Sequence, residues 1–158
     1  MTLRLSEKRP GPGDDRFWVP FDDTDGFTTH WWNRLQRTGS ADYVHLSVVE
    51  GDTEVARVEL DNGVYIDAYR NLPALIASPL EIQFIEVRAS HRFRGVGRAA
   101  VELLAREHPD RTLLAFSEEA DGFWDSLGWT RHIHEEDNEL DPRYRPLYIQ
   151  PRPGSVGR

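Results

Sequence analysis

The apolar residues of this chain recur in two spacings, one typical of strands and one typical of helices. The run of mostly apolar residues over 80–87 predicts a strand, and the run over 112–116 predicts a buried strand. Between these runs, five apolar residues recur every three or four positions, which predicts an amphipathic helix over residues 96–108. Further strands are expected over residues 44–49, 55–60, 129–134 and 144–150, and a further helix over residues 120–127. This order of strands and helices predicts a layered domain of mixed α/β or α+β class.

Another helix is expected nearer the N-terminus, over about residues 27–37. Phe27, Trp31 and Leu35 stand four positions apart there, which gives an apolar stripe along one helix face. Trp31 would then pack inward. Trp32 lies off this stripe, so it is a candidate for lining a pocket or an interface.

The two ends of the chain carry no such pattern. Residues 8–15 are rich in Pro, Gly and charged side chains, so residues 1–15 are expected to form a flexible arm. Residues 151–158 are expected to form a C-terminal tail. A chain of 158 residues is long enough for one hydrophobic core and short for two. We therefore expect a single domain over residues 16–150.

The segment Arg92-Phe93-Arg94-Gly95-Val96-Gly97-Arg98 lies between a predicted strand and a predicted helix. Its two glycines allow the backbone to approach a ligand closely, and the N–H groups of the helix start point the same way. Such a loop suits a phosphate or a pyrophosphate. A Walker loop would need Gly-Lys followed by Ser or Thr, and a dinucleotide-binding turn would need a longer strand–helix order after it. What remains is an R-x-x-G-x-G loop of another kind.

This loop resembles the pyrophosphate-binding motif of the GNAT superfamily of acyl-CoA-dependent N-acetyltransferases. Residues 120–129, Ala-Asp-Gly-Phe-Trp-Asp-Ser-Leu-Gly-Trp, resemble the second family signature, A-x-x-F-Y-x-x-x-G-F, with Trp124 and Trp129 in the later aromatic positions. The two motifs stand in the family's order with a predicted strand between them. The resemblance covers about residues 80–129. It implies a GNAT-like α+β (mixed α/β) fold, in which helices flank a central, mostly antiparallel mixed sheet.

The resemblance also implies that acetyl-CoA is the acyl donor and that an amine, on a small molecule or on a protein, is the acceptor. The pyrophosphate is expected on the backbone amides of the glycine loop, and the pantetheine along the end of the preceding strand. The candidate cofactor-binding residues are Val87, Arg92, Phe93, Arg94, Gly95, Val96, Gly97, Arg98, Phe123 and Trp124.

Acetyl transfer to an amine needs a base that takes a proton from the amine. Glu81 falls near the position where histone-type GNAT enzymes keep their catalytic Glu, and we interpret it as the base. Glu86 lies just before the strand end and is the other carboxylate of this run. Together with Trp32, Glu86 is a candidate substrate-binding residue. Simple strand alternation places the two glutamates on opposite faces.

The departing thiolate needs a proton or a hydrogen-bond donor. Many family members use a tyrosine at the position that Trp124 occupies here, and an indole N–H is not a usable acid near neutral pH. Solvent or a side chain on the last predicted strands is then the candidate, and the side chains are Tyr144, Tyr148, His132 and His134. We name Tyr148 as the candidate catalytic residue among them. The departure at Trp124 puts catalysis itself in question.

Composition narrows the functional class. The absence of cysteine excludes a thiol nucleophile and Cys-ligated zinc, and the pair His132 and His134 has no clear third ligand, so no metal is expected. No apolar run has the length of a signal peptide or a membrane span, so we expect a cytoplasmic protein without a membrane partner. A net charge of −8 argues against nucleic acid as a partner and would suit a cationic amine.

Two functional classes remain open. The first is an N-acetyltransferase whose partners are acyl-CoA and an amine. The second is a non-catalytic GNAT-like module that binds acyl-CoA or a protein, which the tryptophan at position 124 favours. The second signature argues against a third reading, a small α/β phosphate binder that uses no coenzyme A. Whether the chain forms a homodimer stays open.

Overall fold

The computed structural model describes residues 1–73, 78–138 and 143–151. They form two compact units. The first comprises residues 1–62 and 83–108, and the second comprises the described residues among 63–82 and 109–158. Strand β6 (Pro79–Val87) begins in the second unit and ends in the first.

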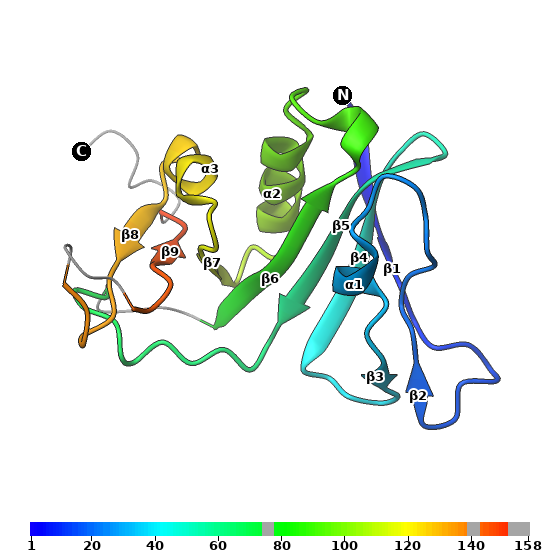
Figure 1. Cartoon of the computed structure of the whole chain (residues 1–158), viewed down its shortest axis with the longest axis horizontal. Coiled ribbons are helices and arrows are strands. Elements are labelled where there is room, and N and C mark those ends of the chain that lie inside the picture. Colours follow the sequence, from blue (N-terminus) through cyan, green and yellow to red (C-terminus); the bar gives the residue numbers. More distant parts are fainter. Residues whose placement is uncertain (74–77, 139–142, 152–158) are drawn as a thin grey trace. The chain divides into compact units, whose positions relative to one another are not determined.

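Within the described residues, seven strands form one mixed sheet in the order β1-β4-β5-β6-β7-β9-β8 (Figure 1). Strands β6 and β7 run parallel, whereas the pairs β1–β4, β4–β5, β7–β9 and β8–β9 are antiparallel. The expected mixed α/β fold with a mostly antiparallel central sheet is therefore confirmed. Besides β6, the strands are β1 (Leu3–Glu7), β4 (Tyr43–Glu50), β5 (Thr53–Asp61), β7 (Thr112–Phe116), β8 (Thr130–His132) and β9 (Leu147–Ile149).

The amphipathic helix expected after the glycine loop is present as α2 (Val96–Glu107). Its buried residues recur at helical spacing, and the helix contacts β1 and β5, so its apolar face covers the sheet of the first unit. Ala99 was expected on this face, but Val101 is buried there instead. The buried residues of α2 are Val96, Ala100, Val101, Leu103 and Leu104.

The N-terminal residues are part of the sheet. Strand β1 pairs with β4 over its whole length, from Leu3 opposite Glu50 to Glu7 opposite Leu46. The flexible arm expected over residues 1–15 is therefore wrong for residues 3–7. The alternation of Leu3 and Leu5 with polar neighbours was the strand signal in this stretch.

The helix expected over residues 27–37 is a single turn, α1 (Thr29–Trp32), and a short strand, β3 (Gln36–Arg37), follows it. Strand β3 pairs with β2 (Phe17–Trp18) in a separate two-stranded ribbon. The expected apolar stripe is also wrong, because Leu35 is 62% exposed and Trp32, expected off the stripe, is only 3% exposed. Trp32 packs against Phe21 and Phe84, so tertiary contacts decide which face of this segment is buried.

The second unit has its own apolar core. Leu114 of β7 and Leu147 and Ile149 of β9 form it together with Ile66 from the segment before β6. Residues 67–71 form turns with an isolated bridge at Tyr69, in place of the short helix expected over residues 65–77, and residues 74–77 lie outside the described residues. Helix α3 (Asp121–Ser126) and strands β8 and β9 occupy parts of their expected ranges. The expected tail is described only at Pro151.

Arg88, the residue after β6, holds the segment before α1 in place within the first unit. Its side chain donates hydrogen bonds to the carbonyl oxygens of Glu54 and Asp25 at 2.6 and 3.3 Å. Its guanidinium also lies over the ring of Phe27. Gly26 sits against this side chain with φ +95°, and its carbonyl oxygen accepts a hydrogen bond from Ala89 N at 2.9 Å. The close packing at Gly26 requires the absence of a side chain.

We predict that Gly26→Ala destabilises the protein. The added Cβ would lie 2.7 Å from Arg88 Cγ, and the positive φ disfavours any side chain. Strain of this kind costs about 1–3 kcal/mol in the free energy of unfolding. Urea denaturation measures it, with Gly13→Ala as the control, because a Cβ at Gly13 meets no atom within 4 Å. Equal stability of the two variants would contradict the packing described here.

Candidate functional site

The glycine loop joins the end of β6 to the start of α2 within the first unit. After β6, a 3₁₀ turn (Ala89–His91) leads into Arg92, whose backbone is extended. Phe93 and Gly95 then adopt left-handed conformations, with φ of +63° and +78°. Glycine adopts this conformation readily, whereas a phenylalanine in it is strained. Strained residues of this kind occur at ligand sites more than elsewhere, and the side chain of Phe93 is fully exposed at the tip of the loop.

The start of α2 carries the positive end of the helix dipole. The helical hydrogen bonds begin with Ala99 N donating to Gly95 O at 3.0 Å, so the amides of Val96 and Gly97 precede the ladder. The first turn contains no acidic residue that would compete for these amides. Three arginines lie in or beside this turn, and Arg92, Arg94 and Arg98 are all exposed or half-exposed. An exposed helix start with arginines around it is the kind of site that suits a phosphate group.

The members of the loop differ in what their side chains can do. Val96 is buried in the core under α2, so only its backbone amide is available to a ligand. Arg98 lies 4.0 Å from Glu102, one helical turn further on. The guanidinium of Arg92 lies 3.6 Å from the carboxylate of Glu86, and its Nε donates a hydrogen bond to Val87 O at 3.4 Å. Arg92 is therefore the loop arginine that is tied to β6.

Glu86 and Trp32, the candidate substrate-binding residues, contact each other. The indole N–H of Trp32 donates to Glu86 Oε1 at 2.8 Å. Thr28 N donates to Oε1 at 2.8 Å, and Thr28 Oγ1 donates to Oε2 at 2.7 Å. Glu86 is 7% exposed and Trp32 is 3% exposed. Both residues thus hold α1 against β6 instead of lining an open surface.

The aromatic residues of the second signature lie in and beside α3, in the second unit. Trp124 is 3% exposed, and its ring packs against Trp129 and Phe123 with centroids 4.7 and 4.9 Å apart. Phe123 is partly buried on the same turn. These contacts account for Trp124 as a core aromatic residue of this unit, and its contact with a cofactor stays a prediction.

Tyr148 is fully buried on β9, and its hydroxyl forms no hydrogen bond of ordinary geometry with any described residue, although the side chain of Asp125 lies close to it. Burial, hydrogen bonding toward Asp125 and the negative charge of Asp121 raise the pKa of Tyr148 to about 12. The hydroxyl is therefore protonated at neutral pH, with the carboxylate of Asp125 as a neighbouring acceptor.

Glu81 lies on β6 within the second unit and is partly buried. It stands opposite Leu114 of β7, which stands opposite Ile149 of β9. Residues directly opposite in paired strands share a face, and successive residues alternate. Glu81 and Tyr148 therefore emerge on opposite faces of this part of the sheet. The structure places the two candidate catalytic residues two strands apart.

The turn between β8 and β9 is held by contacts that the sequence did not reveal. Asp137 accepts hydrogen bonds from the backbone N–H groups of Arg143 and Tyr144, both at 2.8 Å. Although burial opposes the ionised form, these two N–H groups lower the pKa of Asp137. His134 stacks on the ring of Tyr144 with centroids 3.7 Å apart. Asp137, the last of three consecutive acidic residues at 135–137, thus holds this turn together.

His132, one of the two alternating histidines, is buried with Nδ1 donating to Arg70 O at 3.0 Å and Nε2 without a partner among the described residues. In the described part of the chain, no group of three or more His, Cys, Asp or Glu residues could hold a metal ion. Among the described residues, no helix is long and apolar enough to cross a membrane.

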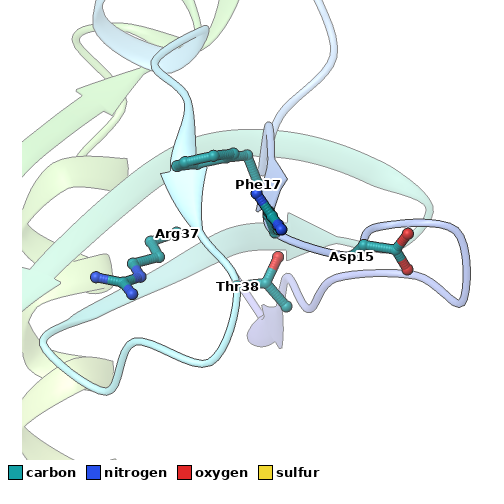
Figure 2. Close-up of a pocket in the computed structure, with 5 residues that line it drawn as sticks. Asp15, Phe17, Arg37 and Thr38 are labelled. Atoms are coloured by element: carbon teal, nitrogen blue, oxygen red, sulfur yellow. The ribbon is translucent and has the colours of Figure 1, made fainter.

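A hollow in the first unit lies beside the β2–β3 ribbon. Figure 2 shows Asp15, Phe17, Arg37 and Thr38 around it, and Arg16 completes its lining. None of the predicted site residues belongs to it. The hollow combines one carboxylate with two guanidinium groups, and no buried unpartnered polar atom of the described residues lies among its lining residues.

Comparison with known proteins identifies the fold. No protein-family model and no curated protein sequence matches the chain. Among solved structures, an acetyltransferase from Thermus thermophilus matches with a TM-score of 0.51 and 17% sequence identity, over 72% of this chain. The match spans 66% of that protein, slightly less than two thirds of its length. The KacTA–DNA complex matches with a TM-score of 0.54 and 15% identity, over 95% of this chain and 93% of that one.

A third structure, the Bacillus subtilis N-acetyltransferase YlbP in complex with coenzyme A, has a TM-score of 0.48 and 24% identity, over 68% of this chain and 67% of that one. Because one neighbour is a DNA complex, the comparisons do not support the expectation that nucleic acid is no partner. The strand order, the glycine loop before α2 and the two matches with TM-scores of 0.51 and 0.54 lead to one conclusion. The chain has the fold of the GNAT acetyltransferases.

Proposed function

We propose that this chain is an acetyl-CoA-dependent N-acetyltransferase that transfers the acetyl group to an amine. The observation that carries the proposal is the loop from Arg92 to Arg98. Two left-handed residues, Phe93 and Gly95, bring the chain to the open amides of a twelve-residue helix. Arginines surround these amides in a protein of net charge −8. This local concentration of positive charge supports the pyrophosphate of coenzyme A as the ligand.

In the proposed reaction, the amine nitrogen attacks the thioester carbon of acetyl-CoA, an N–C bond forms and the C–S bond breaks. Glu81 accepts the proton that the amine loses. The products are an N-acetyl amide and coenzyme A. The side chain of Glu81 is only partly buried, so it remains accessible to a substrate.

Glu81 and Tyr148 emerge on opposite faces of this part of the sheet, so they are alternative candidates and do not act together at one reacting centre. With the thioester on the face of Tyr148, this residue would be the group that meets the departing sulfur. A tyrosine with a pKa of about 12 is a weaker acid than a thiol, whose ordinary pKa is about 8.5. Complete proton transfer from Tyr148 to a thiolate is therefore uphill. A hydrogen bond from its protonated hydroxyl to the sulfur as charge develops, in place of its interaction with Asp125, is the role that this pKa supports. Solvent then supplies the proton to the released thiolate.

The alternative function is a non-catalytic module that binds acyl-CoA. The buried packing of Trp124 favours it, because the residue in the usual tyrosine position has no acidic proton and is fixed in the core. A thiol-release assay with acetyl-CoA over a panel of amines distinguishes the two functions. Release of coenzyme A that depends on an amine supports the enzyme. Binding without release, for every amine, supports the module.

Coenzyme A should stabilise the wild-type protein against heat, and Gly95→Glu should abolish this effect. A ligand at a hundred times its Kd adds about 2.7 kcal/mol to the free energy of unfolding. Gly95→Glu places a negative charge and a bulky side chain where the pyrophosphate is proposed to lie. Gly39→Glu is the matched control, since Gly39 has φ +82° against +78° for Gly95 and equally open surroundings. If the wild type shows no shift at millimolar coenzyme A, the proposed cofactor is wrong.

Glu81→Gln should lower turnover by about 10²–10⁴-fold, the usual effect of losing a positioned base. The loss should be greatest from acidic to neutral pH, where proton removal limits the rate, and coenzyme A affinity should stay unchanged. Steady-state kinetics from pH 6 to 9 measure it, with the exposed Glu50→Gln as the control. Wild-type rates for Glu81→Gln at every pH would remove Glu81 from the mechanism.

The raised pKa of Tyr148 predicts a specific loss of stability in alkali. In the folded protein its pKa is about 12, above the ordinary value of 10. The contribution of the protonated hydroxyl to the free energy of unfolding is therefore complete below pH 10 and is lost as the pH rises toward 12. Tyr148→Phe should therefore lose less stability than the wild type between pH 10 and pH 12. Urea denaturation at pH 8, 10 and 11 measures the difference. Parallel pH profiles for the two proteins would show that Tyr148 titrates normally.

A further inference from the structure

The carboxylate of Glu86 connects α1 to the glycine loop. It accepts three hydrogen bonds, from Thr28 N and Trp32 Nε1 to Oε1 and from Thr28 Oγ1 to Oε2, at 2.7–2.8 Å. The same Oε2 lies 3.6 Å from the guanidinium of Arg92. All four groups belong to the first unit. A single buried side chain thus contacts both the segment before β4 and the loop after β6.

These contacts fix the position of the carboxylate before any ligand arrives. Both oxygens accept hydrogen bonds, and the side chain is almost wholly buried. A buried carboxylate with three donors is held in one orientation, because each lost donor would leave a charge poorly solvated. Thr28 and Trp32 therefore serve as the anchor, and Arg92 contacts the anchored group from the solvent side.

One edge of the Arg92 guanidinium contacts other residues of the protein, and the other edge is exposed. Its Nε donates to Val87 O at 3.4 Å, and the nearby NH2 group faces Glu86. The side chain is 50% exposed, so the remainder of the guanidinium is accessible. Arg94, two residues further on, is exposed and has no contact of this kind among the described residues. An arginine held along one edge presents its other donors in a defined direction, which favours phosphate oxygens.

We infer that Glu86 is a positioning residue, which Thr28 and Trp32 anchor and which orients the guanidinium of Arg92 toward the pyrophosphate. The inference rests on the proposed function, since it assigns a role within the coenzyme A site. It replaces the expectation that Glu86 itself binds the acceptor.

This role can be separated from simple electrostatics because the two predict opposite signs. Glu86 places a negative charge beside an anion site, so removing that charge would by Coulomb attraction alone strengthen coenzyme A binding. If Glu86 orients Arg92, the same removal weakens binding, since the guanidinium loses the contact that fixes its direction. Glu86→Gln keeps the size of the side chain and removes the charge.

The experiment measures the Kd of coenzyme A by calorimetry for wild type, Glu86→Gln, Arg92→Gln and the double variant. Arg92→Gln should weaken binding by about tenfold, the loss expected for one charge-assisted hydrogen bond. Glu86→Gln should weaken it by about three- to tenfold, on the same scale. The double variant should bind like Arg92→Gln alone, because Glu86 acts through Arg92. Independent structural damage would instead make the two losses multiply.

Two further variants test the anchor and the charge. Thr28→Val removes the hydroxyl that bonds to Oε2, the oxygen that faces Arg92, and should also weaken binding, although Thr28 is not a residue of the glycine loop. It also replaces Glu86→Gln if that variant does not fold. Glu102→Gln is the matched control, because Glu102 lies near Arg98 at 4.0 Å in an exposed pair. Its affinity should equal or slightly exceed that of the wild type.

A measurement without ligand separates this inference from the proposed function. In the wild type, NMR relaxation of the Nε–H groups should show that the side chain of Arg92 is more rigid than that of Arg94. In Glu86→Gln, the two side chains should be equally mobile. Failure of the wild type to bind coenzyme A would overturn the proposed site and leave this ordering measurable. Equal mobility of the two arginines in the wild type, or unchanged or tighter binding in Glu86→Gln, would overturn the positioning role.

Discussion

Buried charge is the constraint on which the first unit depends. Strands β5 and β6 carry Arg57, Glu59 and Glu86 into its interior, each less than 8% exposed. A charge without partners inside a protein costs several kcal/mol, and removing one partner of a buried pair costs about 3–5 kcal/mol. The segment between β1 and β4 supplies the missing partners. It has little regular structure, and its position follows from the groups that it offers to these side chains.

Each buried charge receives a different kind of partner. Arg57 bonds to Glu54 and to the carbonyl oxygen of Asp22, and its guanidinium lies over the rings of Phe21 and Phe27. Glu59 contacts His45 and forms an ion pair with Arg34. Glu86 receives the three donors of Thr28 and Trp32 described above. The same polar contacts that hold this segment also connect it to the glycine loop, so packing and the candidate site are not separable in this unit.

The parts of the fold that could be predicted are those that depend on neighbours in the sequence. The spacing of apolar residues and glycines along the sequence predicts strand β6, the glycine loop and α2. All three occur where they were expected. The region around Trp32 failed because its decisive partner, Glu86, lies 54 residues away. The spacing of apolar residues over 27–37 contains no information about such a long-range contact. The same distinction applies to the candidate site. The glycine loop consists of consecutive residues and could be found from the sequence. The burial of Trp124 and the surroundings of Tyr148 depend on tertiary packing and could not.

The pairing of β1 with β4 has a consequence for the handling of the protein. Strand β1 lies at one edge of the sheet, and β4 lies inside it with five consecutive buried residues, His45 to Val49. A chain shortened by its first seven residues would turn β4 into the edge and expose its backbone N–H and C=O groups beside an apolar surface. Edges of this kind recruit strands from other molecules. The seven N-terminal residues therefore act as a cover that keeps the sheet from associating with further copies.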